Sequence, residues 1–335
     1  MSSPAFATLD HMSKGRIGWN IVTTAGDAAA RNFGRDGQAL HSDRYARADE
    51  FVEVVTKLWD SWDDGACVAD KHTGVFADPD LVRPIDHEGT YFRVAGPLTV
   101  PRPPQGYPVL VQAGSSVEGR AFAAKWAEAV YTAQRTLGES QQFYAALKQQ
   151  VVDAGRRPGD IVILPGVAPF LGSTEEEARR REQEFGELIV PPYGLGQLSN
   201  VFGVDLSGLD LDAPLPDVPI EDANEGQRSR ATLIATIARR DKLTVRELLV
   251  RLAGGRGHRT FTGTPEQLAD DLELWFRDGG ADGFNILPPA LPQDLELIVE
   301  HVLPILRSRG LLRHEYAGET LRAHYGLARS ANQLW

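Results

Sequence analysis

Residues 108–116, PVLVQAGSS, join a short apolar run to a Gly-Ser-Ser turn, and a segment with helical spacing follows from Glu118 to Ala127. An apolar run of this length, closed by turn residues, is typical of a buried strand. A strand followed by a turn and a helix is the repeating unit of a parallel α/β sheet. The sequence around residues 108–116 therefore predicts an α/β fold.

The same alternation continues along the chain in both directions. Further strands are predicted at residues 16–23 (RIGWNIVT), 129–132, 161–169 and 281–287, and helices at about 43–62, 139–154 and beyond Thr264. A last long helix is predicted from a stripe formed by Leu295, Val299, Val302 and Leu306. These βα units predict a parallel sheet covered by helices.

Helix starts are marked by capping residues. Ser173 with Glu176, and Thr174 with Glu177, both fit a capping box. Residues 264–267, TPEQ, place an N-cap threonine before a first-turn proline and a glutamine at the third helical position. Two charged or amphipathic helices are therefore expected to begin near residues 174 and 265.

The regular pattern is interrupted between Pro191 and Gly263. This stretch begins with prolines among acidic and glycine residues, which predicts a loop, and only later offers two short helices, the second with a capping box from Thr244 to Glu247. A long irregular stretch inside a compact domain is usually functional, typically as a lid. We therefore treat residues 1–335 as a single domain with an insertion or lid at about 191–263.

Length and composition narrow the function further. The chain has 335 residues, enough for one α/β barrel with an insertion, and 46 acidic against 35 basic residues, which argues against nucleic-acid binding. Cys67 is the one cysteine, so thiolate zinc clusters and intramolecular disulfides are excluded, and the eight histidines lack metal-ligand spacing. No apolar stretch is long enough to span a membrane. We expect a cytoplasmic protein with neither a metal nor a membrane anchor.

Polar residues at the predicted strand ends and helix starts are the candidate ligand contacts. Ser115 and Ser116 follow the strand of residues 108–113, where hydroxyls and helix-start N–H groups can hold a phosphate, although such turns also carry serine simply for capping. His41 and Tyr45 lie four residues apart at a helix start, and Tyr45 suits the core equally well. Asn20 and Thr23 lie at a strand end that faces the active site in a parallel barrel.

Several longer motifs together resemble one known group. They are FATLDHMSKGR (6–16), GWNIVT (18–23), ARNFG (30–34), DRY (43–45), KLWDSW (57–62), PRPPQG (101–106), QAGSS (112–116), TAQ (132–134), GHRT (257–260) and ADGFN (281–285). In this order, over nearly the whole chain, they resemble the nitrilotriacetate monooxygenase, dibenzothiophene-sulfone monooxygenase and pristinamycin synthase group of the bacterial-luciferase-like flavin monooxygenases.

That resemblance implies a (β/α)₈ TIM barrel that uses reduced FMN and O₂ to oxygenate a small organic substrate, in the manner of nitrilotriacetate monooxygenase. A separate NAD(P)H-dependent flavin reductase supplies the reduced flavin in such two-component enzymes, and a homodimer is the family expectation. The cofactor carries the reactivity, while the protein orients it and excludes water. Few protein acids or bases are then required, and no catalytic residue is assigned.

The resemblance also implies roles for single residues. Ser115, Ser116, Tyr45 and His41 look like contacts to the FMN phosphate and ribityl chain, and Asn20 and Thr23 like strand-end contacts to the flavin. Tyr131 and His258 are similar to substrate-pocket residues. In some relatives a histidine near the position of Val201 faces the flavin, and valine here favours the nitrilotriacetate-monooxygenase-like branch.

One departure from the group concerns the N-terminus. Family members carry roughly 100 residues before the stretch that starts here at Phe6, which at about 30 residues per βα unit corresponds to three barrel strands. The chain is thus expected to lack the first strands of the barrel and to leave strand edges unpaired. Two other hypotheses stay open: a deazaflavin-dependent oxidoreductase of the same superfamily, and a catalytically silent barrel fragment.

Overall fold

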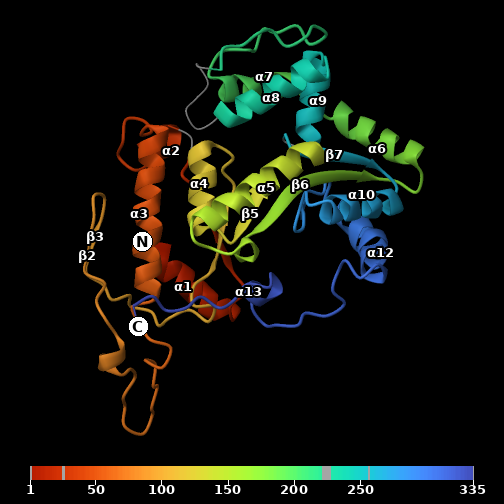
Figure 1. Cartoon of the computed structure of the whole chain (residues 1–335). Helices are drawn as coiled ribbons and strands as arrows, with labels where there is room; N and C mark the ends of the chain where they lie inside the picture. Colours follow the sequence, from red (N-terminus) through yellow and green to blue (C-terminus); the bar gives the residue numbers. More distant parts are fainter. Residues whose placement is uncertain (1, 25–26, 221–227, 256, 335) are drawn as a thin grey trace.

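A parallel sheet forms the centre of the computed structural model, which describes residues 2–24, 27–220, 228–255 and 257–334. Its strands are β1 (Gly18–Asn20), β4 (Val109–Gln112), β5 (Ala129–Thr132), β6 (Val162–Leu171), β7 (Arg259–Gly263) and β8 (Asn285–Ile286). They pair in the order β1-β4-β5-β6-β7, with β8 also on β6, and every pairing is parallel (Figure 1). The predicted α/β class with a parallel sheet is confirmed.

The long strand β6 connects the two halves of the sheet. Its first residues, Val162 to Pro165, pair with β5, and its last, Val167 to Leu171, pair with β7. At the other end of the sheet, β1 pairs with β4 alone among the described strands. The strands observed near residues 16–23 and 281–287 are shorter than predicted, because only residues 18–20 and 285–286 reach ladder geometry with a neighbour.

Helices cover the outside of the sheet. α3 (His41–Trp59), α4 (Val117–Trp126) and α5 (Leu137–Asp153) follow β1, β4 and β5, and α6 (Glu175–Glu187) and α10 (Pro265–Arg277) follow β6 and β7 (Figure 1). α3 was predicted over residues 43–62 and ends three residues earlier, so that Trp62 leaves the helix and donates its indole N–H to the Leu98 carbonyl at 2.8 Å. Thr174 and Thr264 are the observed N-caps of α6 and α10.

Apolar side chains of α3 fix this helix against the start of the sheet. Trp59 is fully buried and meets Trp19 of β1 edge-on, with ring centroids 5.9 Å apart. The neighbouring helix α1 (Ser2–Ser13) adds Phe6 to the same cluster. This packing fixes the C-terminal end of α3 against β1, while Tyr45 in the first turns of α3 packs against the same cluster.

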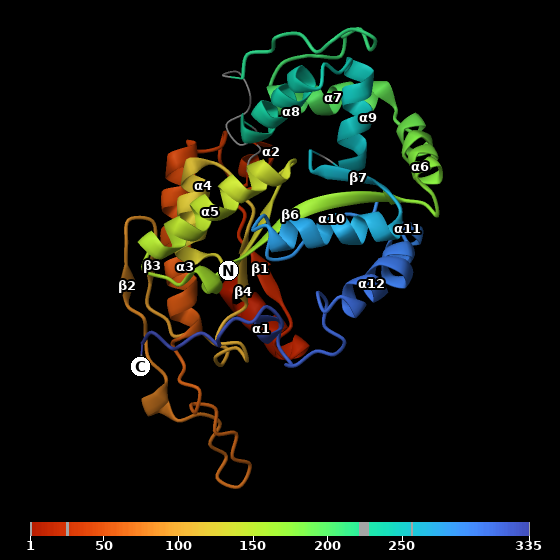
Figure 2. The same ribbon diagram turned by 45° about the vertical axis from the view of Figure 1, so that its right-hand side comes forward.

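A long excursion separates α3 from β4. It contains η1 (Pro79–Leu81), β2 (His87–Glu88) and β3 (Arg93–Val94), and a short helix α2 (Asp27–Arg31) precedes α3. Figure 2 shows the excursion extending away from the sheet, on the side opposite α7, α8 and α9. The excursion therefore lies away from the carboxyl ends of the strands.

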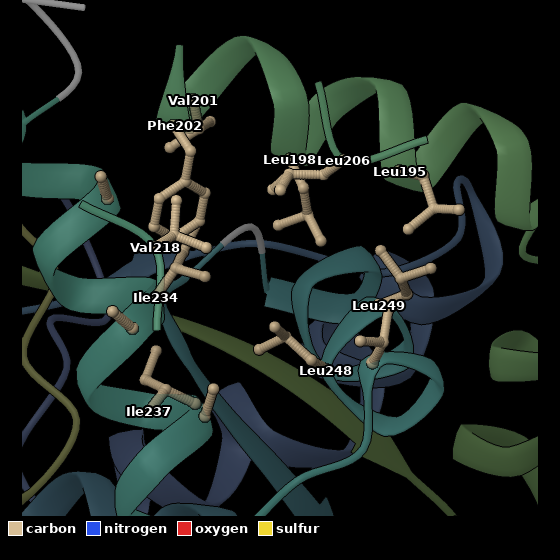
Figure 3. Packing of buried hydrophobic residues seen from close by; sticks show 14 residues of the cluster. Leu195, Leu198, Val201, Phe202, Leu206, Val218, Ile234, Ile237, Leu248 and Leu249 are labelled. Atoms are coloured by element: carbon tan, nitrogen blue, oxygen red, sulfur yellow. The ribbon is translucent and has the colours of Figure 1, made fainter. Parts of the chain in front are cut away.

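The insertion forms a helical layer with its own core. Its helices are α7 (Pro191–Phe202), α8 (Arg228–Arg240) and α9 (Val245–Gly255). Figure 3 shows the cluster, here called the lid core, in which Phe202, Ile234 and Leu248 are almost completely buried. Residues 221–227 and 256 of the predicted insertion lie outside the described residues.

Two predictions about the insertion were wrong. The stretch from Pro191 is a helix rather than a loop, because prolines are tolerated in the first helical turn and Leu195, Leu198 and Phe202 fall on one buried face. Residues 259–263 were assigned to the insertion but form strand β7 of the main sheet. Thr244 and Glu247 cap α9 as predicted.

The buried face predicted for the last long helix was only half correct: Val302 and Leu306 pack on the core, whereas Leu295 and Val299 are exposed. α11 (Gln293–Leu297), a π-helical turn (Ile298–Val302) and α12 (Leu303–Ser308) follow one another, with Ile298 and Val302 buried and Leu295 and Val299 exposed. A π turn holds an extra residue and changes the helical phase. The stripe of residues 295, 299, 302 and 306 assumed an uninterrupted α-helix, which this segment is not.

The C-terminal segment returns to the start of the sheet. It includes α13 (Leu321–His324), whose Arg322 is buried, pairs with Glu128 and donates to the Tyr107 carbonyl at 3.1 Å. The backbone N–H of Arg322 also donates to Gln105 at 3.0 Å.

Among the described residues, no helix combines the length and the apolar character needed to cross a membrane.

Candidate functional site

A cavity of about 390 Å³ lies at the carboxyl ends of β1, β4 and β5. This volume falls within the range of small-molecule sites, and the carboxyl ends of parallel strands are where such sites form in α/β proteins. All eight residues singled out from the sequence line this one cavity: Asn20, Thr23, His41, Tyr45, Ser115, Ser116, Tyr131 and His258. The structure thus brings together side chains that are up to 238 positions apart in the sequence.

One side of the cavity is the turn between β4 and α4. Ser116 is the N-cap of α4, and its hydroxyl accepts the N–H of Gly119 at 3.0 Å. The first N–H groups of a helix have no partner within the helix and favour an anion. Ser115 and Ser116 therefore place hydroxyls and backbone donors at the cavity wall. Ser116 caps α4 as one interpretation predicted, and the same donors could also bind a phosphate.

Close backbone approach at this turn requires glycine. A Cβ atom on Gly114 would lie 2.4 Å from the Gln112 amide nitrogen and 2.7 Å from the Tyr45 hydroxyl oxygen, and one on Gly119 would lie 3.0 Å from that same hydroxyl. The Tyr45 hydroxyl thus lies directly over the turn, while the Tyr45 ring packs edge-on against Phe122 of α4 at 5.8 Å. Tyr45 is therefore both a packing aromatic and a polar group at the cavity.

Basic side chains from the first turn of α3 complete this side. The rings of His41 and Tyr45 lie 4.9 Å apart, and His41 Nδ1 is 3.4 Å from a carboxylate oxygen of Glu118. Arg44 is 8% exposed, donates one guanidinium N–H to the Thr24 carbonyl at 2.6 Å, and has a buried Nε without a hydrogen-bond partner. An orphaned buried donor beside helix-start N–H groups fits a phosphate, so the residues present suit the anionic end of FMN.

The other side of the cavity holds a stacked pair of rings. The Tyr131 hydroxyl and His258 Nε2 are 2.8 Å apart, and the two rings are within 8° of parallel with centroids 4.6 Å apart. Gly166 of β6 makes room for them, because a Cβ there would lie 2.5 Å from His258 Nδ1. Burial lowers the pKa of His258 and raises the pKa of Tyr131, so both side chains are neutral near pH 7.

Among the lining residues that were not singled out from the sequence, three carry a charged or amide side chain: Arg44, Gln112 and Arg230. Arg44 and Gln112 stand next to residues that were singled out, and their signal was a charged or amide side chain on the predicted buried face of an element. Arg230, on α8, lines the cavity together with Leu233. No local pattern marks Arg230, because its place at the cavity depends on how the insertion folds back over the sheet.

Val201 lies away from the cavity. Its side chain is 7% exposed and packs within the lid core, close to Phe202 (Figure 3). It is absent from the described cavity lining. In this chain, the position that carries histidine in some relatives therefore belongs to the lid core and makes no direct contact at the cavity wall.

Comparison with known proteins gives the family. The model of the luciferase-like monooxygenase family matches residues 4–283. The chain belongs to the luciferase-like monooxygenase family. Its similarity to curated members is high: it is 48% identical to N-acetyl-S-(2-succino)cysteine monooxygenase of Bacillus subtilis, covering 98% of this chain and 74% of that one. It is also 48% identical to nitrilotriacetate monooxygenase component A of Aminobacter aminovorans, covering 98% and 72%.

A solved structure of the family supports the same fold. Riboflavin lyase, crystallised with modified FMN and riboflavin, superimposes with a TM-score of 0.84 and 34% identity over 97% of this chain and 71% of that chain. The predicted luciferase-like barrel type and the assignment as a monooxygenase of this family are thereby confirmed.

Proposed function

We propose that this luciferase-like monooxygenase is a two-component enzyme that uses reduced FMN and O₂ to oxygenate a small organic substrate, in the manner of its nitrilotriacetate relative. The overall reaction consumes substrate, FMNH₂ and O₂ and yields oxygenated substrate, FMN and water. The observation that carries the proposal is the single cavity where the α4 turn, the first turn of α3 and the Tyr131–His258 pair meet. The solved relative that contains modified FMN supports the choice of flavin.

Bound at this cavity, reduced FMN would supply the reaction with O₂ and the transfer of one oxygen atom. Ser115, Ser116 and Arg44 would hold the phosphate, with Tyr45 and His41 along the ribityl chain. Asn20, the last residue of β1, and Thr23, which follows this strand, would position the flavin ring. These groups bind and orient, and the chemistry needs no nucleophile from the protein.

Tyr131 and His258 would form the wall of the substrate pocket. Both are neutral near pH 7, so they offer directed hydrogen bonding without adding charge. Helix α8 of the insertion contributes Arg230 and Leu233 to the same cavity. The insertion, from residue 191 to residue 258, would act as a lid over the flavin, with α8 as part of it. A lid excludes water, which would otherwise divert the reduced oxygen to hydrogen peroxide.

The partner is a flavin reductase that supplies FMNH₂ from NAD(P)H. The need for NAD(P)H supports a cytoplasmic location in this proposal, and the proposed assembly is a homodimer. The substrate is a small molecule that fits beside the flavin ring.

The deciding experiment combines a binding and a turnover measurement. FMN and a deazaflavin are titrated against the purified chain by fluorescence, and O₂ uptake and product are then measured with a flavin reductase, NADH and a panel of small organic substrates. We expect FMN to bind and one panel member to be oxygenated. Deazaflavin binding in preference to FMN would favour the deazaflavin enzyme, whereas binding of neither would favour the silent fragment.

A further inference from the structure

Three arginines come together where the insertion meets the sheet. Arg135 lies in the turn between β5 and α5, Arg240 is the last residue of α8, and Arg251 belongs to α9. Arg240 is 2.8 Å from Asp241 and 3.7 Å from Glu139. Arg251 is 3.6 Å from Asp241. These five residues, here called the arginine cluster, hold three positive charges against two negative ones.

Arg135 is the arginine of the cluster that has no partner. Within the described part of the chain, no hydrogen bond or ion pair reaches its guanidinium, and its Nε is buried. Burial lowers the pKa of Arg135, and the charges of Arg251 and Arg240 lower it further, against the opposite effect of the two carboxylates. A half-buried cation beside two like charges is unfavourable unless an anion lies close to it. The cluster therefore calls for one more negative group.

The two carboxylates of the cluster are already engaged. Glu139 accepts the backbone N–H groups of Arg135 and of the next residue at 3.1 and 3.3 Å, as part of the cap of α5. Asp241 accepts a hydrogen bond from Arg240, which lowers the pKa of this carboxyl more than the charges of the three arginines do. Residues 221–227, which lie outside the described residues, precede the opposite end of α8. A bound anion is therefore the simplest source of the additional negative charge.

We propose that Arg135 and Arg251 bind a phosphate-type oxyanion, which ties the insertion to the sheet. Guanidinium groups bind phosphate through paired hydrogen bonds, and an anion with several oxygens can contact two guanidinium groups at once. No residue of the cluster lines the described cavity, so this site is separate from the proposed flavin site. Thr132, three residues before Arg135, does line the cavity. An anion at the cluster would therefore hold α9 next to a strand end that forms the cavity wall.

Inorganic phosphate is the probe that tests the site. The flavin-free chain is studied by calorimetry and thermal unfolding in buffers of equal ionic strength, set with sodium chloride, with and without phosphate. We expect phosphate to bind the wild type and to raise its Tm, because a ligand that binds only the folded state stabilises it. Arg135→Gln should bind phosphate at least roughly tenfold more weakly, the effect of losing one charged hydrogen-bonded pair, and should gain little in Tm. Arg251→Gln should show the same loss.

Arg246→Gln is the matched control. Arg246 lies on α9, as Arg251 does, but pairs with Asp212 outside the cluster, so this variant should gain as much from phosphate as the wild type. Equal gains in Arg135→Gln and in the wild type would mean that phosphate acts only as a generally stabilising salt, and they would overturn the proposal. Without phosphate, Arg135→Gln should be at least as stable as the wild type, because an unpaired like charge has been removed. A lower Tm would assign Arg135 a structural role and contradict the proposal.

Further titrations identify the source of the phosphate and separate this site from the flavin site. Tighter binding of AMP than of inorganic phosphate would assign the site to an organic phosphate, and the reverse order would assign it to the free ion; either result supports the site if Arg135→Gln weakens it. FMN and riboflavin should both bind Arg135→Gln as they bind the wild type. Loss of affinity for FMN alone would place the flavin phosphate at Arg135 and overturn a separate site.

Hydrogen exchange tests whether the anion ties the insertion to the sheet. The backbone amides of α9 should exchange more slowly in phosphate in the wild type, because local opening of the insertion then requires release of the anion. Arg135→Gln should show no such slowing. Exchange in α9 that phosphate leaves unchanged in the wild type would contradict the tie.

Discussion

The phenol of Tyr131 and the imidazole of His258 lie within 8° of parallel, with the hydroxyl 2.8 Å from Nε2, although 127 residues separate them in the chain. Tyr131 comes from β5, and His258 immediately precedes β7. Both strands pair with β6, so the contact forms only when β7, which follows the insertion in the chain, has paired with β6. The pair therefore couples the insertion to the sheet at the cavity.

Gly166 leaves the space in which this pair stacks. In Gly166→Ala, the new methyl group would lie 2.5 Å from His258 Nδ1 and 2.9 Å from a ring carbon of Tyr131, so one ring must move. We expect kcat/KM for a panel substrate to fall at least roughly tenfold, as misplacement of positioning groups does, while FMN affinity changes little. Gly138→Ala is the control, since nothing lies within 4 Å of the added methyl. Unchanged kcat/KM in Gly166→Ala would show that the stacking is not needed.

The lowered pKa of His258 predicts a pH dependence of stability. Burial keeps the imidazole neutral in the folded chain, whereas an unfolded histidine protonates near pH 6.5. The unfolded state therefore binds more protons between pH 6.5 and the lower folded pKa, and the free energy of unfolding falls as the pH falls through that window. Urea titrations of the wild type and of His258→Gln at pH 7.5 and 5.5 measure this. We expect the variant to lose less stability over that range, and equal losses would contradict the neutral, buried imidazole.

The α4 turn is tested by adding one methyl group. A Cβ on Gly114 would lie 2.4 Å from the Gln112 amide nitrogen and 2.7 Å from the Tyr45 hydroxyl, so Gly114→Ala displaces the groups that surround the proposed phosphate site. We expect the dissociation constant for FMN, measured by fluorescence quenching, to rise at least roughly tenfold, equivalent to losing one charged hydrogen bond. Gly196→Ala, on α7 with open space around it, should bind FMN normally. Normal FMN binding by both variants would place the phosphate elsewhere.

The sequence was informative where short-range chemistry decides the structure. The strand of residues 108–113 and the cap at Thr264 were predicted from local periodicity and hydrogen bonding, which the structure retains. Ser115 and Tyr45 meet at one cavity as their positions after a strand and at a helix start suggested. Their ligand roles came from resemblance and remain proposals.

Features that depend on distant contacts could not be read from the sequence. The helix from Pro191 was mistaken for a loop, because its buried face is defined by α8 and α9 rather than by its own composition. The phase of residues 293–308 changes at a π turn that has no local signature. Arg230 reaches the cavity through the packing of the whole insertion.

Arg322 attaches the C-terminal segment to the sheet. Its side chain is 3% exposed, forms a two-point ion pair with Glu128 that includes one contact of 2.8 Å, and donates to the Tyr107 carbonyl at 3.1 Å. Arg322→Leu leaves the half-buried Glu128 without its ion-pair partner, although the Leu110 N–H still donates to it, and we expect a loss of about 3 kcal/mol of unfolding free energy. The control Arg246→Leu removes an exposed pair with Asp212 and should cost under about 1 kcal/mol. If urea titrations show similar losses of unfolding free energy in both variants, burial of the Arg322–Glu128 pair does not add to stability.

Packing of the lid core is expected to decide how much of the O₂ consumed yields oxygenated product rather than hydrogen peroxide. Phe202 is fully buried among the residues of the lid core (Figure 3), and Phe202→Ala removes about 3–5 kcal/mol of local packing free energy. Because α8 belongs to this core and lines the cavity, loosening it admits water to the proposed flavin site. We expect less product and more hydrogen peroxide for each NADH consumed in the reductase-coupled assay, with FMN affinity largely kept. Tyr193→Ala, an exposed change on the same helix, is the control and should leave the ratio unchanged. An unaltered ratio in Phe202→Ala would show that the insertion does not shield the reaction from water.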